Sequence, residues 1–240
     1  MLLVETPDTR AIERDYTLGV VLGELLSLPW RSRATDRNDV RITFEGKDGE
    51  LLLPDVFFSC RESEWLQPAS MPRRPLANWR LSKDQFEALT VSDDLPIIYG
   101  DGKGSLRQKT NSLCLPIDIF GSVFFMLSRY EEMVTTDRDE HDRFPAKASL
   151  AFKEGFLNRP IVDEYLEVLW SALRSLWPNL KRKTQTFRMR VSCDVDHPFT
   201  YDGKLKRCLR RVGGDLLHRR SPGLAMNALV GTWEARKDVY

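Results

Sequence analysis

Two carboxylates follow the end of an apolar segment late in the chain. Asp194 and Asp196 stand two residues apart, directly after a strand expected over 187–193. Residues two apart on a strand face the same side, so both can converge on one cation. Alternatively, one binds a metal while the other takes a proton from water, as metal-assisted hydrolysis requires. A plainer interpretation is a loop whose aspartates cap backbone amides before Pro198, and residue types alone favour it.

The segment Ser192-Cys193-Asp194-Val195-Asp196-His197-Pro198 resembles the first motif of the polysaccharide deacetylases, the NodB-homology enzymes of carbohydrate esterase family four. In that family a strand ends in Thr-Phe-Asp-Asp or in an Asp-Val-Asp variant. The resemblance implies that Asp194 is the catalytic base and that Asp196 binds a divalent metal, expected to be zinc. An alignment shifted by one position would exchange the two roles.

A second resemblance covers more of the chain. The stretches 117–132 and 139–165 are similar to a domain of unknown function that precedes deacetylase domains in bacterial proteins. This similarity implies an N-terminal domain over 1–180 and the start of a deacetylase-like catalytic domain over 186–240. The family also needs two histidines in an H-x-x-x-H-like motif, and this spacing is absent among the three histidines of the sequence: His141, His197 and His218.

We therefore expect an incomplete catalytic domain that is inactive alone. The resemblance implies that full-length relatives hydrolyse N-acetyl groups on a bacterial polysaccharide or its precursor. The alternative hypothesis is a non-catalytic glycan-binding or scaffolding domain, for which tryptophans such as Trp65, Trp79, Trp170 and Trp177 could stack on sugars. Tryptophans packed in a core fit the sequence equally well.

A second group of polar residues follows the most apolar segment of the chain. The planar guanidinium of Arg129 suits a carboxylate or a phosphate. The group could line a sugar- or nucleotide-binding cleft, or it could be a structural ion-pair network at a helix end. The absence of an accompanying nucleophile or metal pattern favours the network. The residues are Arg129, Glu132, Asp139, His141 and Arg143.

Charge is distributed unevenly along the 240 residues. The formal net charge is +1, which by itself predicts neither nucleic-acid nor membrane binding. Residues 181–220, however, hold 12 Lys/Arg and 4 Asp/Glu, so a composition break near residue 180 is expected. The basic stretch 204–220 lacks interleaved aromatic residues, which favours a solvated helix face over a nucleic-acid site.

Cysteine usage and hydropathy indicate a cytoplasmic protein without a membrane span. The N-terminus turns acidic at once, unlike a signal peptide. The most apolar stretch, 119–127, is too short to cross a bilayer. The scattered cysteines form no CxxC pair and are expected to be reduced thiols: Cys60, Cys114, Cys193 and Cys208.

Apolar periodicity predicts an α/β (or α+β) fold. Helices are expected over 9–28, over about 118–130 with Asp118 as the cap, and over 160–177. In the first helix the spacing of Ile12, Tyr16, Val20, Leu22 and Leu26 predicts the buried face. Strands are expected over 40–44, 51–53 and 95–99, with a hairpin turn at 48–49 and a loop over 67–79. The result is a mixed sheet with packed helices, followed by the first strand of a truncated deacetylase-type (β/α) barrel.

Overall fold

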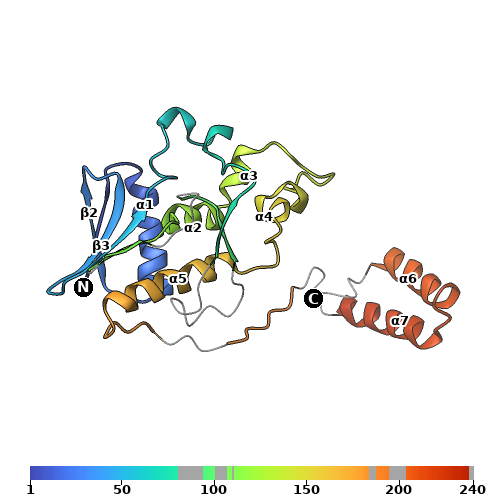
Figure 1. Ribbon diagram of the computed structural model, residues 1–240. Coiled ribbons are helices and arrows are strands. Elements are labelled where there is room, and N and C mark those ends of the chain that lie inside the picture. The colour runs from blue at the N-terminus through green and yellow to red at the C-terminus, as the bar shows by residue number, and fades with distance from the viewer. Residues whose placement is uncertain (81–93, 101–106, 110, 184–187, 195–203, 238–240) are drawn as a thin grey trace. The chain divides into compact units, whose positions relative to one another are not determined.

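The computed structural model describes residues 1–80, 94–100, 107–109, 111–183, 188–194 and 204–237. Contacts within the chain divide it into two units, Met1–Thr184 and Gln185–Tyr240, which are described separately (Figure 1). The first unit contains a mixed sheet and several packed helices. The predicted mixed α/β class with packed helices is therefore confirmed.

Six strands form the sheet of the first unit, in the order β2-β1-β3-β4-β8-β7. The pairs β1/β2 and β4/β8 are parallel, whereas β1/β3, β3/β4 and β7/β8 are antiparallel. A separate antiparallel ribbon pairs β5 with β6. The strands are β1 (Leu2–Pro7), β2 (Trp30–Thr35), β3 (Asp39–Phe44), β4 (Glu50–Pro54), β5 (Ala77–Arg80), β6 (Asp94–Ile97), β7 (Arg107–Lys109) and β8 (Ser112–Cys114).

The hairpin β3/β4 has the form that its sequence predicts. Val40 and Ile42 are buried while their strand neighbours are only partly so, which is the period of two. Gly49 in the turn has a φ of +107°, a conformation that glycine adopts without strain. The indole Nε1 of Trp177 donates a 3.0 Å hydrogen bond to the carbonyl of Asp48. The turn is thereby fixed to the end of the longest helix of this unit.

Helices pack against one another and against the sheet (Figure 1). Helix α5 contacts β4 and β8, and α2 contacts both α5 and α1. The predicted capped, buried helix after Asp118 is confirmed as α2, and the predicted helix over 160–177 is confirmed as α5. The helices are α1 (Ala11–Leu18), η1 (Gly19–Leu25, a π-type helix), α2 (Ile119–Leu127), α3 (Tyr130–Val134), α4 (Leu150–Lys153) and α5 (Ile161–Leu176).

The opposite face of the sheet carries a row of ion pairs. Glu5 on β1 accepts hydrogen bonds from Arg33 on β2 and from Arg41 on β3. Arg41 also donates to Glu50 on β4 at 2.6 Å. Burial opposes ionisation of Glu5, but the hydrogen bonds from Arg41 and Arg33 hold its pKa below the ordinary value. Four adjacent strands are thus linked on this face, as expected for a sheet with one buried face.

The first predicted helix is confirmed only in part. It divides into α1 and η1, and of the predicted buried face Leu22 and Leu26 are buried, whereas its first two residues are not. Ile12 is 85% exposed and Tyr16 is 52% exposed. Arg14 and Leu18 are buried instead, because α1 turns its only buried arginine toward an acid on the loop after β4. The predicted loop over 67–79 is correct until β5 begins at Ala77.

The second unit differs most from the sequence prediction. The strand expected over 187–193 is wrong over the described residues 188–194, which form neither helix nor strand. Val191 is 82% exposed, and neither sheet formed by the described strands includes residues 188–194. A lone strand is not stable. No part of the first strand of a deacetylase-type barrel is present in that segment. Two helices follow, α6 (Leu205–Leu217) and α7 (Pro222–Lys237).

Candidate functional site

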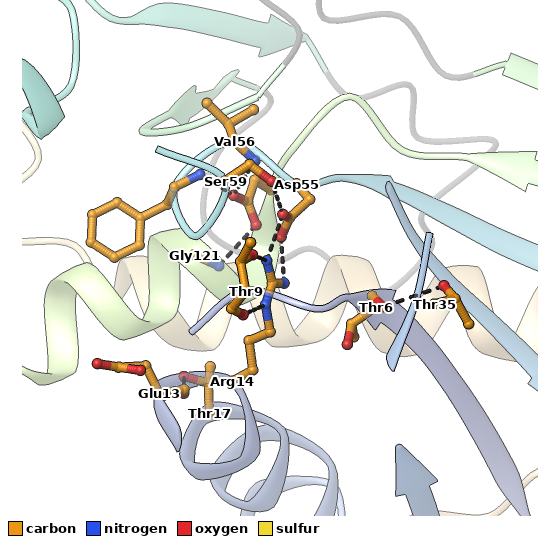
Figure 2. Close-up of polar contacts among 12 residues, drawn as sticks. Thr6, Thr9, Glu13, Arg14, Thr17, Thr35, Asp55, Val56, Ser59 and Gly121 are labelled. Carbon is orange, nitrogen blue, oxygen red and sulfur yellow. Dashed lines mark hydrogen bonds and ion pairs between the residues drawn. The ribbon is translucent and has the colours of Figure 1, made fainter. Parts of the chain in front are cut away.

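A buried ion pair joins the first helix to the loop after β4. Arg14 on α1 is 4% exposed and Asp55 is 1% exposed, measured on their side chains. The guanidinium donates to both carboxylate oxygens of Asp55, at 2.6 and 2.7 Å (Figure 2). Thr9 accepts a further hydrogen bond from Arg14 at 2.8 Å, and Ser59 donates to Asp55. This geometry satisfies both charges without a ligand.

Asp118 lies beside this pair and is completely buried. Its carboxylate accepts hydrogen bonds from the backbone amides of Val56 and Phe57, both at 2.9 Å, and of Gly121 at 2.8 Å. Burial and the neighbouring Asp55 raise the pKa of Asp118 to about 6, although the three amides act in the opposite direction. Asp118 therefore caps α2 and also holds the loop after β4 against it.

The close packing around Asp118 requires glycine at position 121. A Cβ atom on Gly121 would lie 2.4 Å from a carboxylate oxygen of Asp118 and 2.5 Å from the Cβ of Phe57. The cavity beside Arg14 measures only about 10 Å³, too small for a substrate. The buried charges thus join α1, α2 and the loop after β4.

The polar group predicted around Arg129 forms two local ion pairs. Arg129 donates to both carboxylate oxygens of Glu132, and its side chain is mostly exposed. Asp139 pairs with Arg143 at 3.0 Å and accepts from the backbone amide of His141. Each pair lies within four residues of sequence, as in the structural interpretation.

A cavity of about 240 Å³ adjoins part of this group. Arg129 and Glu132 line it together with Glu131 and Phe144. Burial raises the pKa of Glu131, whose carboxylate accepts the backbone amide of Leu150 at 2.7 Å. Asp139, His141 and Arg143 do not line this cavity. The structure therefore divides the predicted cluster rather than gathering it around one ligand.

A larger groove of about 560 Å³ lies elsewhere in the first unit. Its lining includes Cys60, Ser70, Arg73 and Tyr99. Burial raises the pKa values of both Tyr99 and Cys60, so their phenol and thiol stay protonated near neutral pH. The Tyr99 hydroxyl already donates to the carbonyl of Ser70 at 2.7 Å. The groove can hold a small molecule, but neither group is activated as a base or nucleophile.

The tryptophans proposed for sugar stacking lie mainly in the core. Trp79, Trp170 and Trp177 are buried. The ring of Trp65 is covered by the guanidinium of Arg10, 4.0 Å from the ring centroid. These four rings are engaged by the protein itself, so they present no open platform for a sugar.

Comparison with protein families assigns the first unit. The model of a family of unknown function, DUF7033, matches residues 2–178. The chain belongs to the DUF7033 family. Neither the curated proteins nor the solved structures gave a match. The matched residues include the buried groups Arg14, Asp55 and Asp118 and also the group around Arg129. Asp194 and Asp196 follow the DUF7033 domain.

The acidic motif after the DUF7033 domain is only partly described. Asp194 is exposed, whereas Asp196 lies outside the described residues. Within the part of the chain that the structure describes, no three His, Cys, Asp or Glu side chains are close enough together to hold a metal. The described residues alone therefore do not fit a zinc site, and we assign no chemical step to a metal.

The buried and exposed ion pairs of the DUF7033 domain should respond differently to substitution. Arg159→Met leaves the buried carboxylate of Glu164 without its partner, so we expect a clear loss of stability. Arg129→Met removes an exposed partner of Glu132, so the urea denaturation midpoint should hardly change. An equal fall in both midpoints would contradict the assignment of Arg129 to a surface pair.

Proposed function

We propose that the DUF7033 domain is a non-catalytic module of a polysaccharide-deacetylase-like protein, and that Asp194 and Asp196 belong to its metal-dependent part. The observation that carries the proposal is the division of the chain. The compact unit holding the DUF7033 domain ends at Thr184, and the acidic motif follows ten residues later. The module and the motif are then separate parts of one protein. None of the described strands of the first sheet comes from the segment that carries the motif.

The buried carboxylates of the first unit are already bound by other groups of the protein, which supports a non-catalytic role for this unit. Asp55 is neutralised by Arg14, and Glu164 is neutralised by Arg159. Asp118 is bound by three backbone amides. Carboxylates held in this way stabilise the fold and are poorly placed to exchange protons with a substrate. The module would position the deacetylase or bind a partner.

The proposed substrate is an N-acetylated bacterial polysaccharide or its precursor. Hydrolysis of the amide would need a divalent metal, with zinc the expected ion, and Asp194 and Asp196 would contribute a base and a ligand. Further metal ligands would have to come from outside the described residues. We also propose a cytoplasmic location, because all four cysteines carry free thiols. No described helix is long and apolar enough to span a bilayer.

The proposal predicts weak metal binding located at the acidic motif. Two carboxylates alone should bind a divalent ion with roughly millimolar affinity. We would titrate the full chain with Mn²⁺ and record the paramagnetic broadening of backbone amide signals by NMR. Broadening should centre on residues 194–196 and should disappear in Asp194→Ala and Asp196→Ala. Asp137→Ala, which removes an exposed acid elsewhere, is the matched control and should change nothing at the motif.

Two outcomes would overturn the proposal. Broadening that does not include residues 194–196 would mean that the motif does not bind metal. Zinc binding at micromolar affinity or tighter, abolished by Asp196→Ala in calorimetry, would mean that the chain contains a complete metal site. The first unit would then be part of a metalloenzyme rather than an accessory module.

A further inference from the structure

The two helices of the second unit meet through small or polar residues. They lie side by side and are joined by only four residues, 218–221, so they run antiparallel (Figure 1). The thiol of Cys208 is 3.6 Å from the carbonyl oxygen of Ala228. Both residues therefore lie where the two helices contact each other, which we call the seam. The buried residues of this unit are Cys208, Asp215, Ala225, Ala228 and Thr232. Among the described residues of this unit, no large apolar side chain is fully buried, and Val212 is partly buried.

The large apolar side chains of both helices lie outside the seam instead. Leu209 on α6 and Trp233 on α7 are each 60% exposed. Six of the exposed apolar residues repeat at intervals of three, four or seven and so fall in one stripe on each helix, whereas Leu217, Leu224 and Val230 are exposed outside these stripes. Both stripes together form what we call the apolar face: Leu205, Leu209 and Leu216 on α6, with Met226, Leu229 and Trp233 on α7.

The two stripes share one side of the hairpin. On α6, Leu209 and Leu216 directly follow the seam residues Cys208 and Asp215. On α7, Met226, Leu229 and Trp233 directly follow seam residues in the same way. One residue advances about 100° around a helix. Because the helices are antiparallel, the same advance turns both stripes to the same side.

This arrangement inverts the usual pattern of a water-soluble helical hairpin. Soluble hairpins bury their large side chains between the helices and place small or polar ones outside. Here, among the described residues, the small side chains are inside and a contiguous apolar face is outside. Such a face marks an interaction surface.

The charge of the same segment indicates what covers this face. Residues 204–220 contain seven Lys/Arg and one Asp/Glu. Lys206 and Arg210 fall on α6 away from its apolar stripe, where long basic side chains can reach a charged surface. Two copies packed face to face would bring two such basic segments together. A purely polar anionic partner such as nucleic acid would leave the apolar face uncovered.

An anionic lipid surface satisfies both features. We propose that the α6–α7 hairpin lies in the interface of a membrane containing anionic lipids, with its apolar face among the upper acyl chains. Helices with a basic polar face and a face of Leu and Trp bind membranes in this orientation. Basic residues add attraction to the negatively charged leaflet. The hairpin would hold the chain at a bilayer without crossing it, whatever the metal chemistry of the acidic motif.

Vesicle sedimentation tests the proposal on the full chain. The protein should sediment with vesicles of equal phosphatidylglycerol and phosphatidylcholine, and much less with phosphatidylcholine alone or at high salt. Leu209→Gln with Leu216→Gln changes two exposed positions, so the hairpin should still fold, and partitioning should fall at least about tenfold. Arg210→Gln should reduce partitioning about fivefold. Ile12→Gln with Met133→Gln, at exposed positions of the first unit, should leave it unchanged.

Three results would overturn the proposal. The first is absence of sedimentation with the anionic vesicles. The second is binding that the Leu209/Leu216 double variant retains. The third is a dimer in light scattering, dispersed by the same double variant without any vesicle binding, which would assign the apolar face to a second copy of the chain.

Discussion

Arg14→Met should lower the free energy of unfolding by about 3–5 kcal/mol. The substitution keeps the length and the apolar stem of the side chain but removes the cation that neutralises Asp55. Asp55 is 1% exposed, so its charge would remain in a site that water hardly reaches. Among the described residues, only Ser59 would then donate to it from a side chain. Urea denaturation of the full chain, followed by circular dichroism, measures the loss.

A double substitution separates the charge from the packing. Arg14→Met combined with Asp55→Leu removes both charges and should recover a large part of the lost stability, because a buried pair can be replaced by apolar groups of similar size. Arg37→Met is the matched control, since the pair Arg37–Asp39 is partly exposed and should contribute at most about 1 kcal/mol. If the double variant were less stable than Arg14→Met, the charge of Asp55 would not be the cause.

The sequence predicts elements better than it predicts their partners. Asp118 as a helix cap followed from an acid placed before an apolar run, and the cap is present. Its amide contacts with Val56 and Phe57 join residues more than sixty positions apart, and no local pattern encodes such a contact. The hairpin β3/β4 was predictable because its two strands are adjacent in sequence. The parallel pairing of β1 with β2 was not, since η1 and α1 separate them.

The spacing of Arg14 from nearby apolar residues indicates that it is buried, but a prediction from apolar residues alone does not use it. Arg14 stands four and seven residues before Leu18 and Val21, on the face that is buried in the structure. The apolar pattern favoured Ile12 and Tyr16, because it assigns every arginine to solvent. A charged residue in register with an apolar stripe is better interpreted as half of a buried pair. In the structure the partner is Asp55, which directly follows β4.

The predicted strand over 187–193 failed for a physical reason. Met189 and Val191 alternate with basic residues, as in a strand, but a strand needs a neighbour that the pattern itself cannot supply. In the described residues 188–194 both side chains are exposed. Whether Asp194 and Asp196 act together therefore depends on a partner sheet, and the metal titration tests this directly.

Asp118→Ala should reduce the free energy of unfolding by at least about 3 kcal/mol near pH 5, because three buried amide donors lose their acceptor. The loss should be smaller at pH 7. The folded-state pKa of Asp118 is about 6, above the ordinary value of 3.8, so the folded protein binds more protons than the unfolded chain between these values. Stability from this group therefore declines as pH rises toward and through about 6.

The difference between wild type and Asp118→Ala should consequently shrink by about 1 kcal/mol between pH 5 and pH 7. Comparing the two proteins at each pH cancels the titration of groups distant from Asp118. Asp55 contributes to the raised pKa of Asp118. When Asp118→Ala is introduced into the Arg14→Met/Asp55→Leu variant, its effect on stability should therefore change less between pH 5 and pH 7 than it does in the wild type. An equal difference at both pH values would mean that the amides of Val56, Phe57 and Gly121 offset burial completely. Asp118 would then be ionised throughout this range, and its fixed negative charge would stabilise the start of α2 through these hydrogen bonds and through the helix dipole.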